Sequence, residues 1–268
     1  MSLRIQNNIA AFDAERNLNA TSGRLQQSMA RLSSGYRINT AADDAAGLAI
    51  SEKLRAQIGG LQQANSNAQD GISLVQTAEG SLNEVHSMLQ RVRDLAVQYK
   101  NGTLSTEDRN AIQSEVNQLG SEIERIGNSS AFNGISLLAT STAITFQIGA
   151  NDGDSITVST ISLGQAVGSS VFTLSASGTT DISEIDSAIN AVSAQRATFG
   201  AVQNRLEHTI NNLSTYQENL TASESQIRDV DMASEMVEFT KDQILQQAGT
   251  SMLSQANQLP NSVLSLLR

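Results

Sequence analysis

The sequence predicts a mainly α-helical protein, an elongated antiparallel helical bundle with a terminal coiled coil and a small β-hairpin region. Three observations favour this class. Apolar residues recur at alternating spacings of three and four over most of the chain, and at a spacing of two only in its middle. One proline and 18 glycines suit long uninterrupted helices. Aromatic residues make up only 3% of the 268 residues, so burial is expected to be spread along extended interfaces.

Both ends of the chain carry an amphipathic helix pattern. The N-terminal stripe consists of Leu3, Ile5, Ile9, Phe12, Leu18, Leu25, Met29 and Leu32. The C-terminal stripe, at spacings of 4, 3, 4 and 3, consists of Met252, Ala256, Leu259, Val263 and Leu266. Chain ends normally fray because they have little to pack against. Apolar stripes at both ends therefore predict that the two helices cover each other and that further copies of the chain cover the rest.

The first helix is expected from about Ile5 to Ser33, ending near Gly35, a residue that tolerates positive φ. A second start is expected at Thr40, where Asp43 stands in the position of a capping-box carboxylate.

The strongest helix pattern spans 45–99 and ends at Asn101-Gly102. Its two heptad positions hold Val75, Leu82, Leu89 and Ala96, and Ala78, Val85, Val92 and Tyr99. Ser105 and Asp108 predict a capping box for the next helix, which is expected to close at Gly127-Asn128. The seam of this helix consists of Ile112, Val116, Leu119, Ile123 and Ile126.

The middle of the chain, about 142–175, predicts a β-hairpin region. Ile144, Phe146 and Ile148 alternate with polar residues before an Asn-Asp-Gly-Asp turn at 151–154, and the alternation resumes at 156–158. One further strand is expected near 171–174. Asp181 then caps a long helix, and a final helix is expected from about Ser225 to Leu266.

Composition excludes several classes of function. The formal net charge of −10 argues against nucleic-acid binding, which needs a basic surface to neutralise phosphates. The absence of cysteine excludes disulfides and thiolate metal sites. No apolar run is long enough for a membrane span, and no cleavable leader pattern is seen at the N-terminus, so any export is expected to use another route.

Candidate sites for metal binding and catalysis are weak. His86 and His208, the only histidines, are expected on solvated helix faces. Asp43 and Asp44 suit a helix start better than acid–base chemistry, because adjacent helical residues point in different directions. The 151–154 string lacks the remaining ligand positions of a calcium loop. We therefore expect no cofactor, no metal and no enzymatic activity.

Several longer strings resemble bacterial flagellin. They are RLSSGYRIN at 31–39 followed by AADDAAGLAI at 41–50, LQRVRDLAVQ at 89–98, FNG at 132–134, GAVQNR at 200–205, QILQQAGTSML at 243–253, QANQ at 255–258 and VLSLLR at 263–268. The resemblance covers roughly 1–160 and 180–268.

The resemblance implies a terminal coiled-coil domain from 1–40 plus 225–268, which lines the inner tube of a filament. It implies a helical core domain at 41–224 with the β-hairpin, which forms the outer tube. The outer variable domains of larger members are absent, because at most about twenty residues occupy their place. The assembly seam is expected to include Ile5, Ile9, Phe12, Leu18, Leu25, Leu32, Met252, Leu259, Val263 and Leu266.

The implied function is that of a structural subunit of the bacterial flagellar filament, which self-assembles by terminal helix packing to form the propeller for motility. Implied partners are further copies of the chain, the flagellar export apparatus, an export chaperone, and the filament cap and junction proteins. The implied location is the extracellular flagellum. The alternatives are a hook–filament junction protein of the same architecture and, from another class, a soluble coiled-coil scaffold.

Arg91, Leu95 and Glu115 match the residues that flagellins of one type present to the vertebrate Toll-like flagellin receptor. They are candidate innate-receptor contacts. The structural alternative places Leu95 near the helix seam and makes Arg91 and Glu115 a surface ion pair of about 0.5 kcal/mol.

Overall fold

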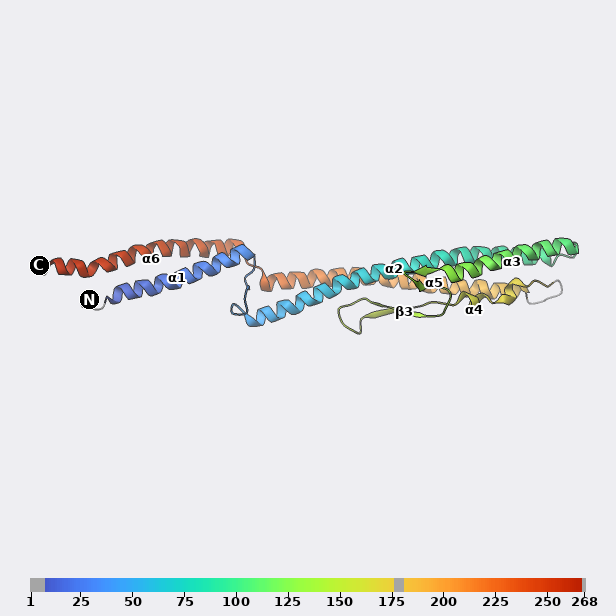
Figure 1. Ribbon diagram of the computed structural model, residues 1–268, viewed down its shortest axis with the longest axis horizontal. Coiled ribbons are helices and arrows are strands. Elements are labelled where there is room, and N and C mark those ends of the chain that lie inside the picture. Colours follow the sequence, from blue (N-terminus) through green and yellow to red (C-terminus); the bar gives the residue numbers. More distant parts are fainter. Residues whose placement is uncertain (1–7, 176–180, 267–268) are drawn as a thin grey trace. The chain divides into compact units, whose positions relative to one another are not determined.

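The computed structural model describes residues 8–175 and 181–266, except for the side chains of 169–170 and 259–266. The chain forms two compact units. Unit 1 comprises Met1–Ala56 with Asn219–Arg268, and unit 2 comprises Gln57–Glu218. The mainly α-helical class predicted from the sequence is confirmed (Figure 1). The six α-helices of the described residues are α1 (Ile9–Ser34), α2 (Ala45–Tyr99), α3 (Thr106–Ser129), α4 (Leu163–Val167), α5 (Asp181–Arg228) and α6 (Met232–Leu266).

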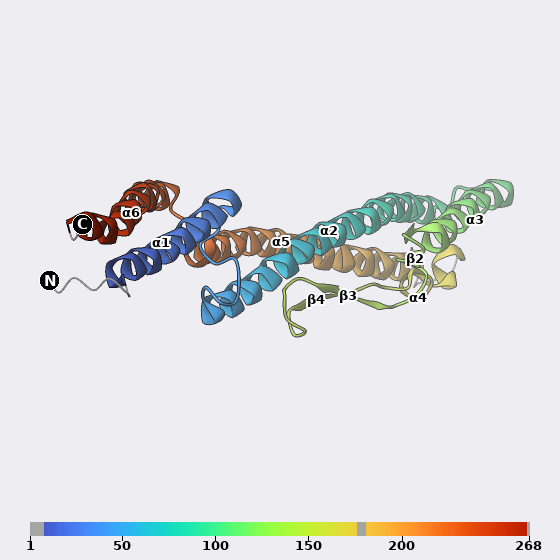
Figure 2. The same cartoon turned by 60° about the vertical axis from the view of Figure 1, so that its left-hand side comes forward.

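Unit 2 is organised around α2, α3 and α5, which run side by side (Figures 1 and 2). The predicted heptad positions of α2 are confirmed as its core face, because Val75, Ala78, Leu82, Val85, Leu89 and Val92 are fully or almost fully buried. The matching buried residues of the other two helices are Ile112, Val116 and Ile123 on α3, and Ile185, Val192, Phe199 and Leu206 on α5. One continuous apolar cluster therefore joins the three helices.

The start of α3 is the predicted capping box. The backbone N–H of Asp108 donates to the Ser105 hydroxyl at 3.1 Å, and the Ser105 N–H donates back to the Asp108 carboxylate at 3.1 Å. The Ser105 hydroxyl, which donates to the Asp108 carboxylate at 2.8 Å, and then the Ser105 N–H hold the pKa of Asp108 below its ordinary value. The box satisfies two of the backbone donors that a helix start leaves without partners.

Two antiparallel hairpins follow α3. The first joins β1 (Ala131–Phe132) to β2 (Ile135–Ser136) through Asn133 and Gly134, both at positive φ, as a type I′ turn requires. The second joins β3 (Ala143–Gln147) to β4 (Ser155–Ser159), with Ile144 opposite Val158 and Phe146 opposite Ile156. The predicted alternation and the 151–154 turn are therefore confirmed.

The further strand expected near 171–174 is wrong. That stretch holds the end of a 3-10 turn, η1 (Ser169–Phe172), followed by irregular backbone, and the short α4 precedes it. The side chain of Gln113 on α3 explains the difference, because its amide donates to the Phe172 carbonyl at 2.7 Å and accepts from the Leu174 N–H at 3.0 Å. These are the backbone groups that a partner strand would have bonded.

In unit 1, α1 begins at Ile9 with the Asn8 side chain accepting from the Ala11 N–H at 3.2 Å. It ends as expected at Gly35, whose φ of 77° suits glycine. The expected start at Ile5 lies outside the described residues.

Two helix boundaries differ from prediction. The Thr40–Asp43 pair forms a turn rather than a helix start, and Asp44 caps α2 by accepting from the Gly47 N–H at 2.8 Å. The boundary expected near Ser225 lies at 229–231, because α5 continues to Arg228. There the Val230 N–H donates to the Gly35 carbonyl at 3.0 Å, which draws the backbone out of the helix.

Arg228, at the end of α5, links the segment that follows α1 to the first part of α2. Its guanidinium lies over the ring of Tyr36 at 4.7 Å and pairs with Glu52 at 2.8 Å. The bond from Arg228 is the main cause of the lowered pKa of Glu52. The next helix, α6, starts at Met232, with the Asp231 carboxylate accepting from the N–H groups of Ala233 and Ser234.

The close approach of α3 to η1 gives a testable prediction for unit 2. A Cβ at Gly120 would lie 2.8 Å from Cγ of Phe172, so Gly120→Ala should lower the free energy of unfolding. We expect a net loss of about 1–2 kcal/mol, because overpacking costs more than alanine gains in helix propensity. Chemical denaturation followed by circular dichroism measures it. The control is Gly80→Ala, an open helical position where stability should rise by up to ~1 kcal/mol. Equal stability of the two variants would contradict the packing.

Candidate assembly surface

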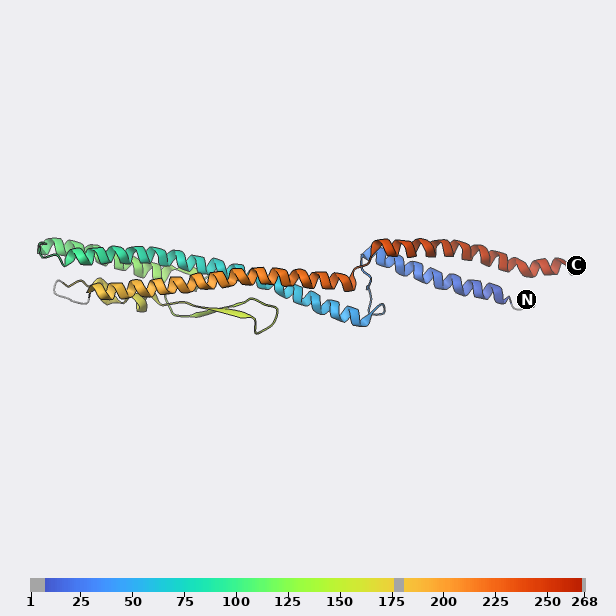
Figure 3. The same cartoon turned by 180° about the vertical axis from the view of Figure 1, so that it is seen from behind.

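The terminal helices α1 and α6 pack side by side and run antiparallel (Figures 1 and 3). Their least exposed residues recur at alternating spacings of three and four, as in a coiled coil. On α1 they are Ala11, Ala14, Leu18, Thr21, Leu25, Ser28 and Leu32. On α6 they are Glu235, Phe239, Asp242, Gln246, Gly249, Leu253 and Ala256. We call this contact the terminal seam.

The terminal seam is rich in polar and small residues. Thr21, Ser28 and Asp242 are buried in it, and Gly249 lets the backbone of α6 approach Leu18. Such residues bury little apolar surface, and the hydrophobic effect scales with that surface. The helix pair is therefore held weakly by its own contact.

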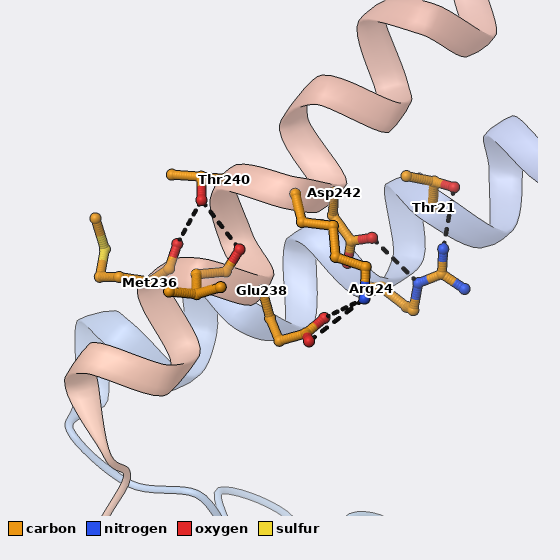
Figure 4. Close-up of polar contacts among 8 residues, drawn as sticks. Thr21, Arg24, Met236, Glu238, Thr240 and Asp242 are labelled. Carbon is orange, nitrogen blue, oxygen red and sulfur yellow. Dashed lines mark hydrogen bonds and ion pairs between the residues drawn. The ribbon is translucent and has the colours of Figure 1, made fainter.

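Ion pairs cross the terminal seam from α1 to α6. The Arg24 Nε lies 3.4 Å from the Asp242 carboxylate, and the Arg24 Nη2 donates to the Thr21 hydroxyl (Figure 4). Arg31 lies 3.7 Å from Glu235. At the distal end of α1 the Asn8 side-chain amide donates to the Ala256 carbonyl at 2.8 Å. These contacts supply polar partners along the length of the seam.

Bulky apolar side chains of α6 point away from α1. Val237 and Ile244 are each 65% exposed and Met252 is 61% exposed, with Leu245 beside them. At 100° per residue they lie between about 70° and 170° around the helix from the middle of the terminal seam. We call Val237, Ile244, Leu245 and Met252 the outer strip. On α1, Ile9 and Phe12 are exposed in the same way.

The structure divides the predicted assembly residues between these two surfaces. Leu18, Leu25 and Leu32 lie half-buried in the terminal seam, whereas Ile9, Phe12 and Met252 are exposed. Ile5 and the side chains of Leu259, Val263 and Leu266 lie outside the described part of the chain.

The candidate receptor residues are only partly at the surface. Arg91 donates from Nε and Nη2 to the Glu115 carboxylate at 2.9 and 2.7 Å, and both side chains are about half exposed. Leu95 is 2% exposed, within the core of unit 2. Only Arg91 and Glu115 are therefore presented by the described chain.

Other kinds of site are weakly represented. Among the residues that the structure describes, no group of three or more histidine, cysteine, aspartate or glutamate side chains is placed to hold a metal ion. No helix within 8–175 or 181–266 has the length and apolar character needed to cross a membrane. A cavity of about 540 Å³ lies in unit 2 between α3 and α4, lined by Gly120, Leu163 and Phe172 among others.

Two family models, one at each end of the sequence, together match most of the chain. Residues 5–143 match the bacterial flagellin N-terminal helical region, and residues 182–267 match the bacterial flagellin C-terminal helical region. The chain belongs to the bacterial flagellin family. The two matched regions contain α1, α2, α3 and α6 completely and α5 except for its first residue, and therefore both helices of the terminal seam.

Curated relatives match this flagellin over nearly its whole length. It is 52% identical to the flagellin of Halalkalibacterium halodurans over 270 residues, covering 98% of this chain and 99% of the relative. It is 49% identical to the flagellin of Bacillus subtilis over 306 residues, covering 99% and 100%. The second alignment is longer than this chain, so that relative carries residues which this short form lacks.

Among solved structures, the crystal structure of Bacillus cereus flagellin matches with 33% identity and a TM-score of 0.52, covering 59% of this chain and 94% of that one. Together with the family match, these relatives make the chain a structural subunit of the flagellar filament. They do not favour the hook–filament junction protein, because these two curated relatives, matched over almost their full length, are flagellins.

Sequence reasoning missed most of the outer strip of α6 and the charged residues of the terminal seam. Val237, Ile244 and Leu245 are apolar residues outside the predicted stripe. The signal for the ion pairs was available, since basic residues at 24 and 31 and acidic residues at 235 and 242 share a spacing of seven. Assigning them required knowing which helix faces which.

The turn after α1 gives a prediction about acid stability in unit 1. The pKa of Asp43 is lowered from 3.8 to about 2, first by the backbone N–H of Thr40, then by the Thr40 hydroxyl and the Gln27 amide. A lowered pKa in the folded state stabilises the fold above the ordinary value of 3.8, and this contribution is lost as the pH falls from about 4 through 2. The protection factors of the Asn39 and Thr40 amide protons, which compare each rate with that of the unfolded chain at the same pH, should therefore fall over that range. Asp43→Asn should show the acid behaviour already at pH 7, and unchanged protection in both tests would contradict the assignment.

Proposed function

We propose that the flagellin subunit assembles into the filament through the outer strip of α6 and the exposed apolar residues of α1. One observation carries this proposal: the outer strip of α6 and Ile9 and Phe12 of α1 are exposed, while most residues of the terminal seam are polar or small. Contiguous exposed apolar surface marks protein contact sites. Since the family forms a homopolymer, the partner that fits this surface is another copy of the same chain.

The same observation favours late ordering of the terminal helices. A helix pair with a weak seam gains little from burial, whereas stacked copies bury the outer strip as well. We infer that 1–40 and 225–268 lack stable order in the isolated subunit and form the inner tube in the filament, while 41–224 forms the outer tube. Strongly protected terminal amides in the isolated subunit would contradict this.

The proposal extends to the route and partners of the subunit. Export through the flagellar export apparatus, an export chaperone, and contacts with the filament cap and junction proteins fit a chain whose terminal helices order on assembly. The proposed location is the extracellular filament. The absence of cysteine and the net charge of −10 suit a surface exposed to water outside the cell.

Seeded polymerisation of the full-length protein, viewed by negative-stain electron microscopy, tests the assembly surface. Ile244→Asp should slow filament extension by at least about tenfold, because it brings a charge into an apolar interface. The matched control is Gln243→Asp, which adds the same charge at a neighbouring exposed position outside the outer strip. Both variants should keep the circular dichroism of the parent. Normal extension by Ile244→Asp would exclude the outer strip from the interface.

We also propose that Arg91 and Glu115 contribute to recognition by the vertebrate Toll-like flagellin receptor. Their side chains form an ion pair at the surface, and Leu95, about one turn along α2 from Arg91, is buried in the core of unit 2. Arg91→Ala should abolish signalling in a receptor reporter cell line while changing stability by less than about 1 kcal/mol, as expected for an exposed ion pair. Arg125→Ala, which breaks another exposed pair on α3, is the control and should signal normally. Undiminished signalling by Arg91→Ala would refute the assignment.

A further inference from the structure

The apolar residues of the terminal seam do not define its alignment. Leu18, Leu25 and Leu32 recur every seven residues along α1, and Thr21 is followed seven residues later by the similar Ser28. If α6 slid along α1 by one heptad, leucine would replace leucine at two of these three contacts, with Ala11 or Asn39 at the third. Apolar packing alone therefore permits several registers.

The two ion pairs across the seam define one register, the same one in which the Val230 N–H donates to the Gly35 carbonyl just beyond the end of α1. Arg31 follows Arg24 by seven residues, and Glu235 precedes Asp242 by seven. Arg24 pairs with Asp242 at 3.4 Å and Arg31 pairs with Glu235 at 3.7 Å. Both pairs therefore belong to the same alignment of an antiparallel helix pair.

A slip of one heptad keeps only one of these pairs. In one direction Asp242 faces Asn17 while Glu235 faces Arg24. In the other direction Asp242 faces Arg31 while Glu235 faces Ile38, beyond the end of α1. The acidic side chains are nearly buried, at 4% and 12% exposure. A buried carboxylate that loses its cation is strongly destabilising, so either slip is penalised.

We propose that Arg24–Asp242 and Arg31–Glu235 are the register-determining pairs of the terminal seam. Their role is selection of one alignment over its heptad-shifted neighbours, rather than net stabilisation of the helix pair. A one-heptad slip would move α6 by about 10 Å along α1, and would displace the outer strip relative to Ile9 and Phe12. The register assignment stands on the helix pair alone, and its consequence for assembly rests on the proposed function.

Disulfide trapping measures the register directly, since the chain contains no native cysteine. A Cβ placed on Gly249 would lie 4.0 Å from the Cβ of Leu18, within the range that a disulfide spans. Leu18→Cys with Gly249→Cys therefore reports the observed register. Leu25→Cys or Ala11→Cys, each combined with Gly249→Cys, reports a slip of one heptad in either direction.

Each reporter is equilibrated in a glutathione buffer as the soluble full-length protein. The disulfide traps whichever paired state of α1 and α6 forms, even where pairing is transient, and its yield is quantified on non-reducing gels. With native pairs, the observed-register disulfide should exceed each slipped one by more than about tenfold. A variant with leucine at 24, 31, 235 and 242 should keep its helix content, while the three reporters come within about threefold of one another. If that variant still prefers the observed register, the proposal is overturned. Equal yields of all reporters with native pairs would overturn it too.

A charge exchange controls for the loss of fold. Arg24→Asp and Arg31→Glu combined with Asp242→Arg and Glu235→Arg should restore the observed register, whereas the two α6 substitutions alone should lose it. Failure of the full exchange to restore the register would count against pairing as the cause.

Seeded extension separates this inference from the proposed function. The leucine variant should extend seeds at least about tenfold more slowly than the parent, because slipped subunits cannot align the outer strip. If the reporters behave as expected but the parent fails to extend seeds, the assembly proposal fails and the register assignment stands. If the leucine variant slips yet extends seeds normally, the link from register to assembly is wrong.

Discussion

The polar seam between α1 and α6 is the constraint on which the rest of the terminal unit depends. Each helix has one face toward its partner and another toward the outside, and α6 carries Val237, Ile244 and Met252 on the outer face while polar residues such as Asp242 are buried in the seam. A pair built the other way would bury those residues internally and would have little reason to polymerise. The weak contact within one subunit is thus the condition for strong contacts between subunits.

Unit 2 follows the opposite rule. Its three long helices direct their heptad leucines and valines at one another, and the β3–β4 hairpin adds Ile156 and Val158 to the same cluster. Small residues set the close approaches, as where Gly71 contacts Phe146 and Gly120 contacts Phe172. Unit 2 therefore has a complete core of its own, whereas the terminal unit keeps its largest apolar side chains on the surface.

The fold was predictable wherever the spacing of apolar residues or the capping residues indicated one element clearly. The heptads of α2, the Ser105 box of α3 and the alternation around Phe146 each predict an element that the structure contains. The errors came from residues whose partners lie far away in the sequence. The Gln113 side chain bonds the Phe172 carbonyl in place of a partner strand. The Gly35 carbonyl accepts from the Val230 N–H just after the end of α5. The candidate surface was harder still, because two apolar stripes on one helix cannot be assigned to partners until the helix has a neighbour.

The division of the chain into units has a kinetic consequence. Unit 2 is one continuous segment, 57–218, whereas unit 1 joins both ends of the sequence. Contacts between α1 and α6 close the longest loop that this chain can form, and the entropy of closing a loop grows with its length. Once unit 2 has folded, residues 57–218 of that loop are no longer flexible, and closing the loop then costs less entropy. The terminal helices are therefore expected to be the last part of the subunit to form in folding and the first to come apart in unfolding.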